Sequence, residues 1–258
     1  MNHLQQTDNK QLLNKVPEIT LYFWVIKILC TTVGETAADY LNADMQLGLS
    51  GTTLFMSVLL LAFLVMQLRS KRYIAWLYWI VVALISIVGT LITDNLVDNL
   101  GVALETTTIT FGIALLITFI AWYKSAGTLS IHTIFNRKRE LYYWTAILFT
   151  FALGTAAGDL AAEGLALGYA NSLMIFSGLI GVVSLFHFRF KANAILTFWI
   201  AYILTRPLGA SLGDYLSQAS SDGGLGLGAG TTNLVFLSAI VSLVIYLTLA
   251  KPDVKELA

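Results

Sequence analysis

The stretch Phe23–Asp39, FWVIKILCTTVGETAAD, contains the pattern that decides the fold, because the chain repeats it four times. Each copy has an aromatic residue followed by Trp, nine further residues, Gly, four further residues and Asp, without a gap and inside apolar sequence. Successive glycines lie 55, 65 and 55 residues apart, which is typical of a duplicated duplication. The copies contain Trp24, Gly34 and Asp39; Trp79, Gly89 and Asp94; Trp144, Gly154 and Asp159; and Trp199, Gly209 and Asp214.

The composition places the chain in a membrane. Its 258 residues are 57% hydrophobic and only 12% charged, which excludes an ordinary soluble domain. Eight apolar runs, two in each repeat, are long enough to cross about 30 Å of hydrocarbon. We therefore expect an all-α integral membrane protein with eight transmembrane helices, arranged as four parallel two-helix repeats with internal pseudo-symmetry. The expected spans are 19–41, 52–68, 74–96, 104–123, 141–162, 171–188, 194–216 and 231–250.

Basic residues indicate the orientation. Lys and Arg precede the first span and follow spans two, four, six and eight, and none lies in the other set of loops. The positive-inside rule then predicts a multi-pass protein of the cytoplasmic (inner) cell membrane with both termini in the cytoplasm. All four repeats share this orientation. We expect a cytoplasmic tail over 1–18, a first half with repeats 1 and 2 over 19–123, a cytoplasmic connection over 124–140, a second half with repeats 3 and 4 over 141–250, and a cytoplasmic tail over 251–258.

The second span of each repeat begins with a pair of small polar residues, which we interpret as N-caps. The pairs are Thr52-Thr53, Thr106-Thr107, Asn171-Ser172 and Thr231-Thr232.

The repeat aspartates are the main candidates for chemistry. At 1.5 Å per residue each Asp lies about 22 Å beyond its Trp, near the far end of its helix. Carboxylates at or in a membrane are costly and usually face a cavity or pathway, and four parallel repeats can place four of them around one axis. Such a ring concentrates cations, and carboxylate and hydroxyl oxygens are the ligands of hard cations. The predicted metal-ligating residues are Asp39, Asp94, Asp159 and Asp214.

The residue four positions before each Asp lies on the same helix face. Three copies have an oxygen-bearing side chain there, and these residues join the predicted ion-binding set: Glu35, Thr90 and Thr155. The fourth copy has Ala210. Because Glu35 stands one turn before Asp39, we expect Asp39 to be the most sensitive of the four aspartates.

Two basic residues within spans break the symmetry and are candidates for counter-charge or gating. Lys27 lies near the start of its span, where the ordinary role of a lysine is to extend to the near interface. Arg206 is too deep for that and is expected to pair with Asp214 or Glu35. Pro207 should loosen the same helix.

The repeat Trp and Gly residues have ordinary structural roles. Tryptophan near the end of a span commonly anchors a helix at the membrane interface, in the aromatic belt. Glycine within a span commonly permits close helix packing. Both residue types are therefore assigned to packing or anchoring.

With four tandem two-helix repeats, each carrying a tryptophan, the chain resembles a bacterial family of uncharacterised polytopic membrane proteins that is defined by this fourfold repeat. The resemblance covers about 19–250. It implies a cytoplasmic-membrane protein in which Trp24, Trp79, Trp144 and Trp199 are the repeat tryptophans, and it implies no catalytic residue.

The functional hypothesis is a transporter of a small cation, with a divalent metal ion as the first choice, export as the favoured direction and protons as a candidate coupling ion. Phosphate loops, dinucleotide fingerprints, HExxH and nucleophile elbows are absent, so we expect neither an enzyme nor a cofactor. Basic residues flank the spans, and nucleic-acid binding has no support. The alternatives are a passive cation channel, then a non-transporting membrane scaffold or sensor, and last an intramembrane enzyme. The oligomeric state stays open.

Overall fold

The structure, a computed structural model, describes residues 14–253, so most of the two expected tails lies outside it. This part of the chain has no strand and contains eight long helices, each apolar enough to cross a membrane. The protein is thus an all-helical, multi-pass membrane protein. Its helices are α2 (Leu21–Asp39), α3 (Gly48–Arg69), α4 (Ala75–Asp94), α5 (Leu104–Ala126), α6 (Arg137–Asp159), α7 (Tyr169–Phe190), α8 (Ala194–Ser217) and α9 (Ala229–Ala250).

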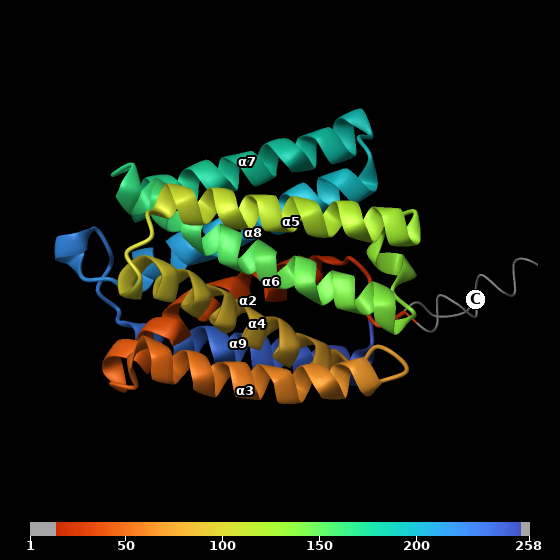
Figure 1. Cartoon of the computed structure of the whole chain (residues 1–258), viewed down its shortest axis with the longest axis horizontal. Helices are drawn as coiled ribbons and strands as arrows, with labels where there is room; N and C mark the ends of the chain where they lie inside the picture. The colour runs from red at the N-terminus through yellow and green to blue at the C-terminus, as the bar shows by residue number, and fades with distance from the viewer. Residues whose placement is uncertain (1–13, 254–258) are drawn as a thin grey trace, which may run out of the picture.

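The first helices of the repeats form an inner ring. α2 packs on α4, α4 on α6, α6 on α8, and α8 back on α2. In these four spans 56–78% of the most apolar window is buried, against 0–22% in α3, α5, α7 and α9. All eight long helices run along one axis, with α3 and α7 at opposite edges of the view (Figure 1). The inner helices run in the same direction because an outer helix returns the chain after each of them.

Each outer helix packs mainly on the inner helix of the next repeat. α3 contacts α4, α5 contacts α6, α7 contacts α8, and α9 contacts α2. The last helix of the chain therefore closes the ring on the first. The outer helices expose Leu, Ile, Val and Phe along their length, as expected of surfaces that face lipid.

The repeat glycines hold the ring together, and their expected packing role is confirmed. Each glycine contacts the residue that lies three positions before the glycine of the next repeat. A Cβ on Gly89, for example, would lie 2.7 Å from Cβ of Phe151, so no larger residue fits without a shift. Small residues at such crossings let neighbouring helices approach closely. The four contacts are Gly34 with Ser86, Gly89 with Phe151, Gly154 with Arg206, and Gly209 with Thr31.

The aromatic-Trp pairs form a second layer of the ring. Each aromatic residue packs against the tryptophan of a neighbouring repeat, with ring centroids 5.5–6.4 Å apart: Phe23 on Trp79, Tyr78 on Trp144, Tyr143 on Trp199, and Phe198 on Trp24. The aromatic-belt interpretation is wrong for Trp79, Trp144 and Trp199, which are 1–4% exposed. Their indoles fill the space between inner helices, whereas Trp24 is half-buried.

The N-cap interpretation of the outer helices is wrong as well. These helices begin two to four residues before the polar pairs, and their N-cap residues make no side-chain hydrogen bond. Hydroxyls in the first turns instead donate to the carbonyl four residues earlier, as Thr53 does to Leu49 and Thr232 to Gly228. The N-cap prediction failed because packing, and not a capping side chain, sets where these helices begin. Glycine or an apolar residue can then precede the first turn, while the hydroxyls bond back to the helix backbone.

Candidate functional site

The repeat aspartates lie at one end of the ring. Asp39, Asp94 and Asp159 are the last residues of α2, α4 and α6, and each is followed at once by a five-residue π-helical turn. A wider turn changes the direction in which side chains point and is frequent at functional sites. In the fourth repeat Asp214 lies inside α8, which continues to Ser217. The turns are Tyr40–Asp44, Asn95–Asn99 and Leu160–Gly164.

Three carboxylates meet at this end. Glu35 from α2, Asp159 from α6 and Asp214 from α8 each offer an oxygen within 4.8 Å of the others. Glu35 and Asp214 are buried, while Asp159 is partly exposed. No other such group of His, Cys, Asp or Glu occurs within residues 14–253. We call these three residues the carboxylate cluster.

The structure does not bring all four repeat aspartates within this distance. Asp39 and Asp94 lie outside the carboxylate cluster, although the charge of Glu35 acts on both. Asp39 accepts a hydrogen bond from Nε2 of Gln218 at 3.3 Å. Glu35 and Asp39 both belong to α2. The carboxylate of Glu35 nevertheless lies close to Asp159 and Asp214, because it accepts a hydrogen bond from Arg206 on α8. This arrangement does not favour Asp39 as the most sensitive position.

Arg206 connects all four inner helices. Its Nη2 donates to Oε2 of Glu35 at 2.8 Å, to Oγ1 of Thr155 at 2.6 Å and to Oγ1 of Thr90, and its Nη1 donates to the carbonyl of Thr31 at 3.1 Å. The side chain is completely buried, and its stem passes over Gly154. The ion pair with Glu35 is one of the two that the sequence predicted.

Thr90 and Thr155 bind the guanidinium in this structure. Each hydroxyl donates its own proton to the carbonyl four residues earlier, at 3.2 Å. The oxygen is thereby left as an acceptor for Arg206. The predicted ion ligands Glu35, Thr90 and Thr155 thus share one partner. Ala210, which stands at this position in the fourth copy, is buried.

A family profile matches four successive segments of the chain. The family is described as Repeat of Unknown Function (DUF347), and the matched residues are 22–73, 77–128, 142–193 and 197–252. The chain belongs to this family. Each match contains one inner and one outer helix, so the unit of the DUF347 family is the same two-helix repeat that forms the ring. No curated protein and no solved structure matches the chain.

Lys27 does not extend to the interface, so the ordinary interpretation of this lysine is wrong. Its side chain is completely buried in the ring. Nζ donates to Oγ1 of Thr205 at 3.1 Å and lies 4.5 Å from the ring centroid of Phe151 and 4.1 Å from that of Tyr202. Aromatic faces attract cations electrostatically. A second buried basic side chain therefore lies about one helical turn from Arg206 along the ring.

The sequence interpretation missed the three residues around Lys27. Tyr202, Thr205 and Phe151 precede the glycine of their repeats by seven, four and three positions, and Lys27 precedes Gly34 by seven. Because the inner helices of this DUF347 chain are parallel, residues that precede their repeat glycines by the same number of positions lie at similar heights in the ring. The register of the repeats was the signal that could have found Tyr202, which has the same offset as Lys27.

Proposed function

We propose that this protein is a secondary transporter of a small cation, with divalent metal ions as the preferred class. The observation that carries the proposal is the carboxylate cluster, held beside the buried Arg206 at one end of a ring of parallel helices. The carboxylate cluster offers three carboxyl groups against one guanidinium. Oxygen ligands of this kind suit hard divalent cations.

The pairing of Arg206 with Glu35 suggests how binding changes the protein. A cation that enters the carboxylate cluster competes with the guanidinium for Glu35. Loss of that ion pair would leave Arg206 with its threonine and carbonyl partners on α2, α4 and α6. Because these bonds span the inner ring, a cation or a proton on Glu35 would alter contacts among all four inner helices. Arg206 thus acts as an internal counter-charge.

Buried groups further along the ring favour a transporter over a passive channel. Lys27, Phe151 and Tyr202 are completely buried about one turn or more below the carboxylate cluster. The fixed positive charge of Arg206 would oppose a cation that moves past it, and the packed side chains around Lys27 leave no open path. Passage therefore requires a rearrangement, which a transporter has and an open pore lacks.

The opposite end of the ring is closed by the segment before α2. The ammonium of Lys15 lies 2.6 Å from Oε2 of Glu140, and both side chains are buried. The backbone amide of Lys15 donates a hydrogen bond to the carbonyl of Ile134, and the backbone amide of Tyr73 donates one to the carbonyl of Asn14. These contacts support a state that is closed at this end.

Flux measurements test the proposal. The full chain in liposomes should take up Mn²⁺, Mg²⁺ or Zn²⁺ saturably and in response to a pH gradient, and the transported ion should raise its thermal stability. An ion at 100 times its Kd stabilises by about 2.7 kcal/mol. Conductive ion flux that needs no pH gradient would support the channel. The absence of both flux and stabilisation with every ion would support the scaffold or sensor. If export is the direction, cells lacking the protein should become sensitive to the transported ion.

We further propose that both termini are cytoplasmic, because Lys and Arg residues gather at the end of the molecule where the two termini lie. Single cysteines replace residues at the two ends, with the native Cys30 buried. Asp98→Cys should react with an impermeant thiol reagent in intact cells, whereas Arg72→Cys should react only after permeabilisation. The reverse pattern would invert the orientation, and labelling of both positions in intact cells would contradict the eight-span topology.

A further inference from the structure

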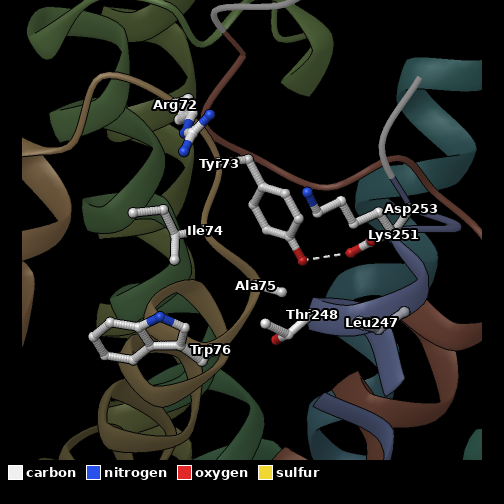
Figure 2. Close-up of a pocket in the computed structure, with 9 residues that line it drawn as sticks. All are labelled: Arg72, Tyr73, Ile74, Ala75, Trp76, Leu247, Thr248, Lys251 and Asp253. Atoms are coloured by element: carbon white, nitrogen blue, oxygen red, sulfur yellow. Dashed lines mark hydrogen bonds between the residues drawn. The ribbon is translucent and has the colours of Figure 1, made fainter. Parts of the chain in front are cut away.

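A pocket of about 270 Å³ lies at the basic end of the molecule, opposite the carboxylate cluster. It is formed where α4 begins, by Arg72 to Trp76, and where α9 ends, by Leu247, Thr248 and Lys251, together with Asp253. Figure 2 shows the charged ends of Arg72 and Lys251 on either side of Tyr73, with Ile74 and Trp76 further along one wall. One part of the pocket is therefore basic, and another part is an apolar wall.

The two basic side chains of this pocket are available to a ligand. Arg72 and Lys251 are both exposed, and neither belongs to an ion pair among residues 14–253. Lys251 occupies the left-handed region at φ 50°, which is uncommon for lysine and ends α9 at this point. Its amide still donates to Leu247 at 3.0 Å. The end of α9 thus places this lysine in the pocket, together with the residues at the start of α4.

The one acid of the pocket is already bonded. Oη of Tyr73 donates to Oδ2 of Asp253 at 2.5 Å, which Figure 2 marks as a dashed line. Burial raises the pKa of the Asp253 carboxyl above its ordinary value, although the bond from Tyr73 opposes that shift. The two exposed cations outnumber this carboxylate, and the pocket keeps a net positive charge.

The apolar wall lies where lipid meets the protein. Trp76, in the first turn of α4, is 39% exposed, and Leu249, which lies in the last turn of α9 next to the pocket residue Thr248, is 79% exposed. Tryptophan at such a position is typical of the headgroup level of a bilayer. A ligand with a negative headgroup and apolar chains fits both parts of the pocket, whereas a free anion would use only the basic end.

We propose that this pocket binds the headgroup of an anionic phospholipid, with the phosphate between Arg72 and Lys251 and the acyl chains along α4 and α9. Basic pockets between transmembrane helices commonly bind anionic headgroups in this way. The site is separate from the carboxylate cluster and does not depend on cation transport.

Native mass spectrometry of the detergent-purified full chain tests the site, with phosphatidylglycerol and phosphatidylcholine as probes. The variant Arg72→Gln/Lys251→Gln should bind phosphatidylglycerol about 30-fold more weakly than the parent, since each basic residue near a bilayer adds roughly 1 kcal/mol and 1.4 kcal/mol is a factor of ten. The matched control is Arg189→Gln/Lys191→Gln, because Lys191 also ends a helix at positive φ but lies outside the pocket. The control should bind like the parent, and phosphatidylcholine should bind more weakly than phosphatidylglycerol.

Equal thermal stability of the lipid-free variants shows that both are folded. Parental phosphatidylglycerol binding by the pocket variant would overturn the proposal. An equal loss of phosphatidylglycerol binding in the control variant would also overturn the proposal, because binding would then depend only on nonspecific surface charge. Displacement of the lipid by millimolar inorganic phosphate would assign the pocket to free phosphate instead of lipid.

Discussion

Arg206→Ala is expected to destabilise the protein by about 3–5 kcal/mol, because removal of one partner leaves a buried charge without compensation. The variant would lose the ion pair with Glu35 and the bonds to Thr31, Thr90 and Thr155. Glu35 would then face Asp159 and Asp214 with no counter-charge. Thermal unfolding in detergent measures the effect as a lower Tm.

Two further variants separate the ion pair from general damage. Arg189→Ala removes an exposed arginine at the end of α7 and should change stability by no more than about 0.5 kcal/mol. Adding Glu35→Gln to Arg206→Ala should recover roughly 0.5–3 kcal/mol, the usual coupling between contacting residues. An Arg206→Ala protein with parental Tm and flux would mean that the guanidinium is not needed as a counter-charge.

Asp159→Asn and Asp214→Asn should each weaken cation binding by at least about tenfold, which corresponds to roughly 1.4 kcal/mol. Asn keeps the size and one acceptor oxygen of Asp but removes the charge that a divalent cation requires. Since both residues belong to the carboxylate cluster, the loss should appear in the ion-induced rise in Tm and in the concentration that gives half-maximal flux.

The chain provides its own controls for this experiment. Asp39→Asn and Asp94→Asn make the same chemical change at the same repeat position, but outside the carboxylate cluster, and should have smaller effects. Equal losses in all four variants would instead restore the ring of four aspartates that the sequence predicts. Four variants with the parental ion response would rule out the transport proposal and leave the scaffold or sensor.

The architecture was accessible from sequence because it rests on periodic features. Eight apolar runs and four copies of one motif predict the helices and their common direction, and the glycine spacing predicts close helix crossings. Arg206 could also be assigned an acidic partner, because a guanidinium within a span must be compensated. These inferences need only the local chain and the solvent properties of a bilayer.

The details of the site were less accessible because they depend on which helices are neighbours. Trp79, Trp144 and Trp199 lie at positions that suit a membrane interface, yet the ring buries them. Lys27 could have extended along its own helix to water, but Phe151 and Tyr202 from other repeats enclose it. Neither outcome follows from one helix alone.

By itself the sequence determined the repeat unit, the number of spans and the position of each aspartate along its helix, since hydropathy and spacing are properties of single segments. Only the tertiary structure decided that Glu35 joins Asp159 and Asp214 and that Arg206 bonds to three neighbouring helices. The physical reason is that charges buried among helices pair by distance across the ring, and those distances exist only once α8 has packed against α2 and α6.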